Sequence, residues 1–126
     1  MEYYQKVIAI CERVLGEEHP DTATSYNNIG VVFYNTGDYS KALEYYQKAL
    51  AIREKVLGEE HPDTATSYNN IGYVFGEMGD YPKALEYYQK ALTIREKVLG
   101  EEHPNTATVR DNIRAAHRAM GNYSDE

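Results

Sequence analysis

Histidines beside carboxylates recur at equal intervals along this chain. His19, His61 and His103 are 42 residues apart, and each follows two glutamates and precedes a proline. Histidine and carboxylate side chains bind metal ions, so the pattern raises the question of a metal site. If the equal spacing reflects helical repeats that stack side by side, corresponding loops lie roughly 20 Å apart, for two helix spacings of about 8–10 Å, whereas a shared metal needs ligands at about 2 Å. We therefore expect no metal, and a loop or helix-capping role for the three histidines.

Other catalytic patterns are weak. Pairs of carboxylates recur on solvated helix faces, where no apolar pocket would shift their pKa values. The sequence contains no Gly-x-Ser-x-Gly elbow, no phosphate-binding glycine loop and no His-Glu-x-x-His stretch. Its one cysteine, Cys11, excludes an intrachain disulfide. At the same 42-residue spacing the chain has Arg53 and Arg95, so position 11 is polar elsewhere and we expect a partly exposed, inert thiol. The chain is predicted not to be an enzyme and to use no cofactor.

The length and composition indicate an acidic chain of the size of one domain. Its 126 residues include 13 Lys or Arg and 20 Asp or Glu, for a net charge of −7. That charge opposes binding to a phosphate backbone, and no apolar run approaches the roughly 20 residues that span a bilayer. We therefore expect no nucleic-acid partner, no membrane insertion and a cytoplasmic location. The basic stripe of Arg110, Arg114 and Arg118 is interpreted as a charged outer face, because three nearby acidic residues balance it.

The chain repeats itself with a period of 42 residues. Segment 19–60 matches segment 61–102 at 36 of 42 positions, and weaker copies precede and follow them. Self-similarity at a fixed period is typical of a solenoid, in which each repeat buries its apolar face on its neighbours. The differing pairs are Val31/Tyr73, Tyr34/Gly76, Asn35/Glu77, Thr36/Met78, Ser40/Pro82 and Ala51/Thr93.

Each repeat carries the signals of two helices. Asp63 follows a proline and places negative charge in a first turn, and Gly79 supplies a stop, which predicts a helix over about 63–78. Asp80 is expected to cap a second, longer helix that runs to Leu99. Apolar and small residues fall at i, i+3, i+4 and i+7 in both helices, so they share one face and form an antiparallel hairpin. The two faces consist of Tyr68, Ile71, Gly72 and Phe75, and of Ala84, Tyr88, Ala91 and Arg95.

This pattern resembles the tetratricopeptide repeat. The matching positions are Tyr26, Ile29, Gly30, Phe33, Ala42, Tyr46 and Ala49, and again Tyr68, Ile71, Gly72, Phe75, Ala84, Tyr88 and Ala91. The period of 42 in place of the usual 34, and the absence of the family's late proline, resemble the subclass found in kinesin light chains. The resemblance implies an all-α fold, an α-solenoid of antiparallel helix hairpins wound as a right-handed superhelix.

The positions of the chain's first and last residues within the repeat predict six helices, in one domain over residues 1–126. The chain opens on the second helix of a hairpin and closes on the first helix of another. In that last helix Arg114 stands at the close-packing glycine position, where it would clash with a following helix, so the helix is interpreted as a solvated cap. The expected segments are a partial repeat at 2–16, repeats at 19–60 and 61–102, a terminal helix within 103–121 and a tail at 122–126.

By the resemblance, the first helices of the hairpins line a concave groove. Four of the six differences between the repeats fall in the second half of those helices, although clustering of surface drift is an open alternative. The groove positions implied are Thr24, Asn27, Asn28, Val31, Tyr34 and Asn35, then Thr66, Asn69, Asn70, Tyr73, Gly76 and Glu77, and finally Asp111.

The groove residues point to a peptide or protein ligand. The four asparagines are the expected anchors, because an amide donates to a peptide carbonyl and accepts from its N–H, and Tyr34 and Tyr73 offer rigid aromatic area. Glu77 and Asp111 make part of the wall acidic, which favours a neutral or basic segment. The leading hypothesis is thus a non-enzymatic scaffold. The alternatives are head-to-tail self-association through the terminal helices, and a consensus-like fragment of a longer array without standalone function.

Overall fold

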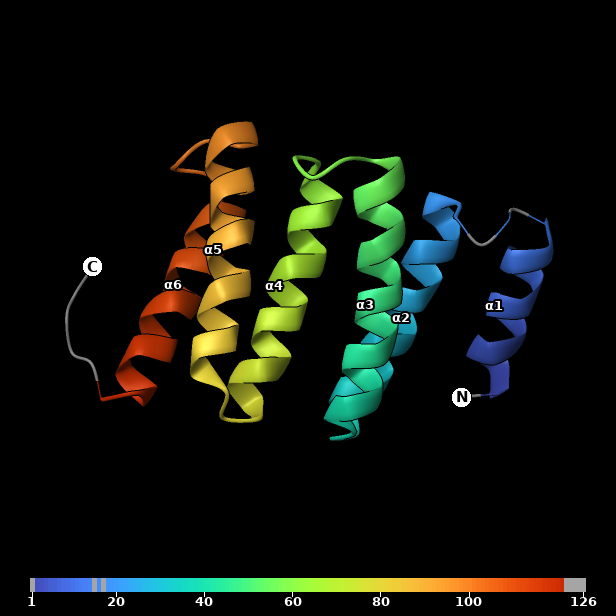
Figure 1. Cartoon of the computed structure of the whole chain (residues 1–126), viewed down its shortest axis with the longest axis horizontal. Coiled ribbons are helices and arrows are strands. Elements are labelled where there is room, and N and C mark those ends of the chain that lie inside the picture. Colours follow the sequence, from blue (N-terminus) through green and yellow to red (C-terminus); the bar gives the residue numbers. More distant parts are fainter. Residues whose placement is uncertain (1, 15, 17, 122–126) are drawn as a thin grey trace. The chain divides into compact units, whose positions relative to one another are not determined.

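The computed structural model describes residues 2–14, 16 and 18–121, without the side chains of residues 2–4, 11 and 14, and every regular element in that part is an α-helix (Figure 1). The helices are α1 Glu2–Val14, α2 Pro20–Asn35, α3 Tyr39–Val56, α4 Pro62–Glu77, α5 Tyr81–Val98 and α6 Pro104–Ala119. The all-α prediction and the six-helix order are confirmed. The helix expected at 63–78 begins and ends one residue earlier, and the next one ends at Val98, with Leu99 as its cap. The predictions for the Cys11 thiol and for the tail at 122–126 fall outside the described residues.

The chain forms two compact units, residues 1–59 and 60–126. The first holds α1, α2 and α3, and the second holds α4, α5 and α6. In each unit the most extensive interface is the antiparallel hairpin predicted from the repeat, α2 with α3 and α4 with α5. A single array over the whole chain stays a prediction.

Histidine caps the N-terminus of α2, α4 and α6. In each case Nδ1 of the histidine accepts a hydrogen bond at 3.0 Å from the backbone N–H two residues later, at Asp21, Asp63 and Asn105. The first N–H groups of a helix have no partner within it, so a side-chain acceptor at this position stabilises the start. The capping role predicted for the three histidines is therefore confirmed.

Aspartate and glycine form the turn inside each hairpin. Asp80 Oδ1 accepts from the Lys83 N–H at 3.3 Å, as predicted, and Asp38 does the same for Lys41. Gly79 has a φ of 86°, in the left-handed region that residues with a Cβ avoid. The backbone therefore ends the first helix and starts the second within a few residues.

The paired helices approach closely at a glycine. A Cβ placed on Gly72 would lie 2.8 Å from Cδ1 of Tyr88 and 3.1 Å from the backbone oxygen of Ala84. The equivalent Gly30 faces Tyr46 at 2.6 Å. Each tyrosine ring thus occupies the place that a side chain on the facing helix would take.

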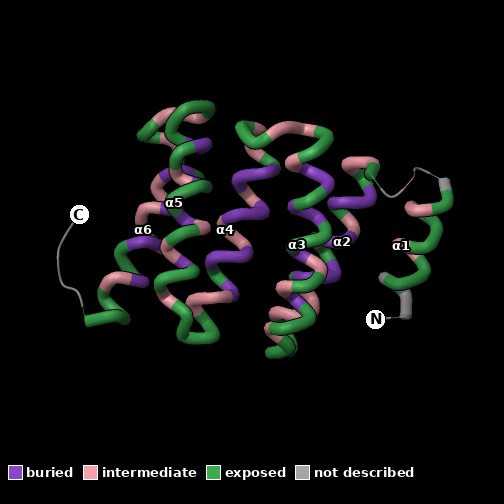
Figure 2. Tube along the Cα trace, viewed as in Figure 1, coloured by how far each residue is buried: buried purple, intermediate pink, exposed green. Residues whose placement is uncertain are grey.

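Alanines, isoleucines and tyrosines make up most of the buried apolar residues in both units, and the buried positions recur at helical intervals along α2 to α5 (Figure 2). Beside this core, Phe75 stacks on Tyr87 with ring centroids 5.8 Å apart, and the Lys90 ammonium lies 5.4 Å from the Tyr87 centroid. The first unit repeats the arrangement with Phe33, Tyr45 and Lys48. Cationic side chains thus cover half-buried aromatic faces.

Buried Arg95 joins the three helices of the second unit. Its Nη1 donates to the backbone oxygen of Asn105 at 3.1 Å and its Nη2 to Oγ1 of Thr66 at 3.2 Å. Burial lowers the pKa of the guanidinium, and these hydrogen bonds compensate for part of its lost hydration. Thr106 donates in turn to the Arg95 carbonyl at 3.3 Å, which fixes the start of α6 against α5.

Candidate functional site

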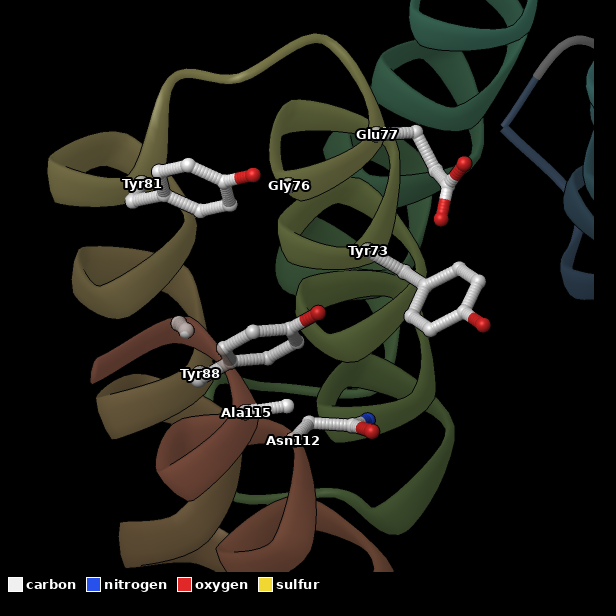
Figure 3. Close-up of a pocket in the computed structure, with 8 residues that line it drawn as sticks. Tyr73, Gly76, Glu77, Tyr81, Tyr88, Asn112 and Ala115 are labelled. Carbon is white, nitrogen blue, oxygen red and sulfur yellow. The ribbon is translucent and has the colours of Figure 1, made fainter. Parts of the chain in front are cut away.

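A cleft of about 220 Å³ opens in the second unit, where α4, α5 and α6 meet (Figure 3). Side chains from all three helices surround it, so it exists only when the hairpin and α6 are packed together. Its lining consists of Tyr73, Gly76 and Glu77 from α4, Tyr81 and Tyr88 from α5, and Asn112, Ala115 and Ala116 from α6.

Tyr73 and Glu77 of the predicted groove wall lie at the rim of this cleft. They are one helical turn apart and project from the same side of α4 (Figure 3). Tyr73 is 44% exposed although it is a large aromatic residue, and Glu77 is also exposed. Glu77 makes no ion pair with any residue that the structure describes. The rim therefore offers an aromatic face beside a carboxylate that is available to a ligand.

Gly76 leaves space at the back of the cleft. A Cβ placed there would meet Oη of Tyr88 at 3.8 Å and Cβ of Ala84 at 4.0 Å, which is ordinary contact. In the first repeat the same position carries Tyr34, whose ring lies 5.6 Å from that of Tyr39 at an angle of 45°. The second repeat thus keeps the tyrosine of the facing helix, at position 81, and lacks the ring that packs against it.

Asn69, a predicted anchor, is held by a neighbouring helix. Its Oδ1 accepts a hydrogen bond at 3.1 Å from Nδ2 of Asn112, and both side chains are partly buried. Asn112 was not among the predicted residues, although it stands 42 residues after Asn70 and the repeat could have indicated it. Also outside the expected set were Tyr81, Tyr88, Ala115 and Ala116.

Two further groove positions are engaged within the second unit. Thr66 is partly buried: its hydroxyl accepts from Arg95 and donates to the Pro62 carbonyl at 3.2 Å. Asp111 is exposed and accepts from Arg114 at 3.1 Å, one turn along α6. Both residues therefore have a partner within the chain, and neither lines the cleft.

The remaining predicted residues are distributed along α2 and α4. Thr24, Asn28, Val31 and Asn35 are exposed, whereas Asn27, Tyr34 and Asn70 are partly buried. Thr24 donates to the Pro20 carbonyl at 3.3 Å. Of the predicted groove positions, the structure brings Tyr73, Gly76 and Glu77 to the cleft.

Two arginines of the basic stripe on α6 have acidic or backbone partners. Arg110 lies 3.8 Å from Oε2 of Glu96 and donates to the Glu101 carbonyl, and Arg114 pairs with Asp111. Arg110 takes the place of Tyr26, which donates to Glu12 in the first unit. Among the described residues, no three His, Cys, Asp or Glu side chains gather as ligands for a metal ion, and none of the described helices has the length and apolarity to cross a membrane.

Repeated antiparallel helical hairpins, each with a glycine facing a tyrosine at its closest approach, are typical of the tetratricopeptide class of α-solenoid, here with a period of 42 residues in place of the usual 34. The family model described as Tetratricopeptide repeat matches this sequence over residues 2–55, 32–97 and 63–125. The chain belongs to the tetratricopeptide repeat family.

Solved structures confirm the resemblance to kinesin light chains. The crystal structure of BtubC (BKLC) from P. vanneervenii matches with a TM-score of 0.89 and 27% identity, over 97% of this chain and 49% of that one. The crystal structure of a putative kinesin light chain with nearly identical TPR-like repeats, from Podosopora anserina, matches with a TM-score of 0.86 and 26% identity, over 96% of this chain and 57% of that one. A second crystal structure of that Podosopora protein, a point variant, gives the same values. This chain thus spans about half the length of these structures, and the comparison with curated proteins gave no match.

Proposed function

We propose that this chain is a non-enzymatic scaffold of the cytoplasm that binds a peptide or protein segment at the face carrying Tyr73 and Glu77. One observation carries the proposal. Three of the six positions at which the two nearly identical repeats differ, 73, 76 and 77, line the same cleft. The close glycine–tyrosine contacts and the aspartate caps of the hairpins are the same in both repeats, and half of the differences between the repeats lie where a ligand would make contact.

The chemistry of the cleft favours a side chain with both apolar and basic character. Tyrosine supplies a rigid contact surface at low entropic cost, and the exposed Glu77 carboxylate attracts a cation. The chain also carries a net charge of −7, which assists the approach of a basic segment.

Self-association through α6 is less favoured by the packing. Arg114 is exposed and stands at the position of Gly30 and Gly72, which have tyrosine rings within 2.6–2.9 Å of a Cβ. A following helix that packed in the same way would collide with the arginine side chain, so an additional copy of the chain does not extend the array there by the same contact.

A displayed peptide library selected on the full chain tests the scaffold function. Selected peptides are then titrated against the wild type and against Tyr73→Ala, with Val98→Ala as the matched control, because Val98 is 46% exposed and lies outside the cleft. We expect Tyr73→Ala to weaken binding at least about thirtyfold, the loss of about 2 kcal/mol that marks a hot-spot residue, and Val98→Ala to leave it unchanged. Selected peptides whose affinity is the same for both variants would contradict the proposed face.

A further inference from the structure

We propose that the cleft beside Gly76 is a pocket for an aromatic side chain, of tyrosine or phenylalanine size, in a ligand segment that carries a basic group next to that ring. The inference rests on the proposed function and names the ligand class of the same face. It follows from three observations: the missing ring at position 76, the size of the cleft, and the carboxylate at its rim.

The first repeat shows how a ring fits at this position. Tyr34 and Gly76 occupy corresponding places on α2 and α4, and the tyrosine that packs against Tyr34 has its counterpart in Tyr81. Figure 3 shows the rings of Tyr81 and Tyr88 on the α5 side of the cleft, near Gly76. A ligand ring that enters here takes the place of the absent side chain and makes the contact that Tyr34 makes with Tyr39. Tyr34 in the first repeat thus shows how the aromatic ring of a ligand would pack beside Gly76.

The volume agrees with a single ring. An apolar protein cavity of about 150 Å³ accepts benzene, so a cleft of about 220 Å³ has room for a phenol. Tilted aromatic pairs with centroids about 4.5–7 Å apart are favourable beyond their buried area, and the Tyr34–Tyr39 pair falls in that range at 5.6 Å. An aliphatic side chain would fill part of the space without this contact.

The Glu77 carboxylate at the rim favours a basic residue next to the aromatic residue of the ligand. Glu77 is exposed, next in sequence to Gly76, and has no cationic partner among the residues that the structure describes. In the first repeat the corresponding residue is the neutral Asn35. The repeat that lacks the ring is therefore also the repeat that carries the carboxylate, and the two changes together match an aromatic residue followed or preceded by lysine or arginine.

Small probes separate the two parts of this inference. Tyramine carries a phenol and an ammonium group, p-cresol carries the ring alone, isopentylamine the cation alone, and 3-(4-hydroxyphenyl)propionate the ring with an anion. Each is titrated into the ¹⁵N-labelled full chain while the amide shifts of residues 76 and 77 are followed. We expect tyramine to bind more tightly than p-cresol by about threefold, as for an exposed charge pair, and both to bind more tightly than isopentylamine and the anion.

The decisive variant is Gly76→Tyr, which gives the second repeat the residue of the first. It fills the cleft with the chain's own ring, and we expect it to weaken tyramine binding at least about tenfold. Val98→Ala is the control, because Val98 is exposed and lies outside the cleft, and it should retain binding. Gly76→Leu is a second filling variant, built from a good helix former, and keeps the test valid if the tyrosine variant does not fold. Glu77→Gln should remove the advantage of tyramine over p-cresol.

The outcomes distinguish this inference from the scaffold function. Tyramine binding by a folded Gly76→Tyr or Gly76→Leu protein at the wild-type affinity overturns the pocket, and so does the absence of shifts at residues 76 and 77 in the wild type. In either case, peptides whose affinity depends on Tyr73 would leave the scaffold function in place. If tyramine binds as expected and no peptide depends on Tyr73, the pocket stands and the proposed groove face is wrong.

Discussion

Nδ2 of Asn112 in α6 donates a hydrogen bond to Oδ1 of Asn69 in α4, over 3.1 Å. The two helices belong to successive repeats and make few other close contacts, because each packs mainly against α5. The carbonyl of Asn69 is therefore committed to holding the helices in register. The NH2 group of Asn69 can still donate hydrogen bonds to a ligand.

Removing this hydrogen bond should destabilise the second unit. We expect Asn112→Ala to lower the free energy of unfolding by about 1 kcal/mol, the net value of a partly buried hydrogen bond, as measured by urea denaturation. A double-mutant cycle with Asn69→Ala isolates the pair. Additive effects of the two substitutions would show that the side chains do not interact.

Position 72 should not tolerate a side chain, whereas position 76 should tolerate one. We expect Gly72→Ala to destabilise the chain by about 1–3 kcal/mol, because its Cβ would meet a Tyr88 ring atom at 2.8 Å. Gly76→Ala should be neutral or stabilising by up to about 1 kcal/mol, since alanine is the better helix former and its Cβ has room. Thermal unfolding followed by circular dichroism compares the two, and equal midpoints would refute the close approach.

The histidine cap of α4 should depend on a side-chain acceptor and not on the ring. His61→Ala removes the acceptor of the Asp63 N–H, and we expect a loss of about 1 kcal/mol in unfolding free energy, measured by urea denaturation. His61→Asn keeps an oxygen within reach of that N–H and should restore most of the loss. An asparagine variant as unstable as the alanine variant would mean that the histidine acts by another contact.

Arg95 and Thr66 should be energetically coupled. Arg95→Met keeps much of the apolar stem but removes both donors, so we expect a loss of about 1.5–3 kcal/mol, as for hydrogen bonds to a charged group. Thr66→Val should cost less when Arg95 has already been replaced than it costs in the wild type. The cycle is measured by urea denaturation, and equal costs in the two backgrounds would contradict the coupling. Unaltered peptide affinity in Thr66→Val would also separate this structural threonine from the ligand-binding residues.

Burial raises the pKa of Tyr46 to about 12 from an ordinary value of 10.0. The folded chain therefore holds this proton where the unfolded chain releases it, and the free energy of unfolding falls as the pH rises from about 10 to about 12. The contribution is fully present below about pH 10, and about 2 kcal/mol is lost near pH 12. Tyr46→Phe keeps the ring without this titration. Its unfolding free energy, measured by urea at about pH 9 and about pH 11.5, should fall less than that of the wild type, and parallel losses would contradict the burial of the hydroxyl.

Much of the fold follows from local patterns that the repeat displays twice. Asp80, Gly79 and the proline after each histidine act within one turn of the chain, so the helix bounds predicted from them are correct to within one residue. Arg95 was placed correctly on the buried stripe by spacing alone, but its partners Thr66 and Asn105 lie on other helices. Spacing within one helix identifies a face. It does not identify which side chain of another helix meets that face.

The candidate site likewise has features that the sequence predicts and features that depend on packing between helices. The sequence alone determined that positions 73, 76 and 77 differ between two otherwise nearly equal repeats, and that they share a helical face, because both facts are properties of the residue order. The tertiary structure decided that Gly76 leaves a cleft, because the cleft needs Tyr81 and Tyr88 from α5 and Asn112 from α6 at its walls. It also decided that Thr66 and Asn69 are engaged with other helices. Helical periodicity is set by the backbone within a segment, whereas a cavity is set by side chains that packing brings together from segments far apart along the chain.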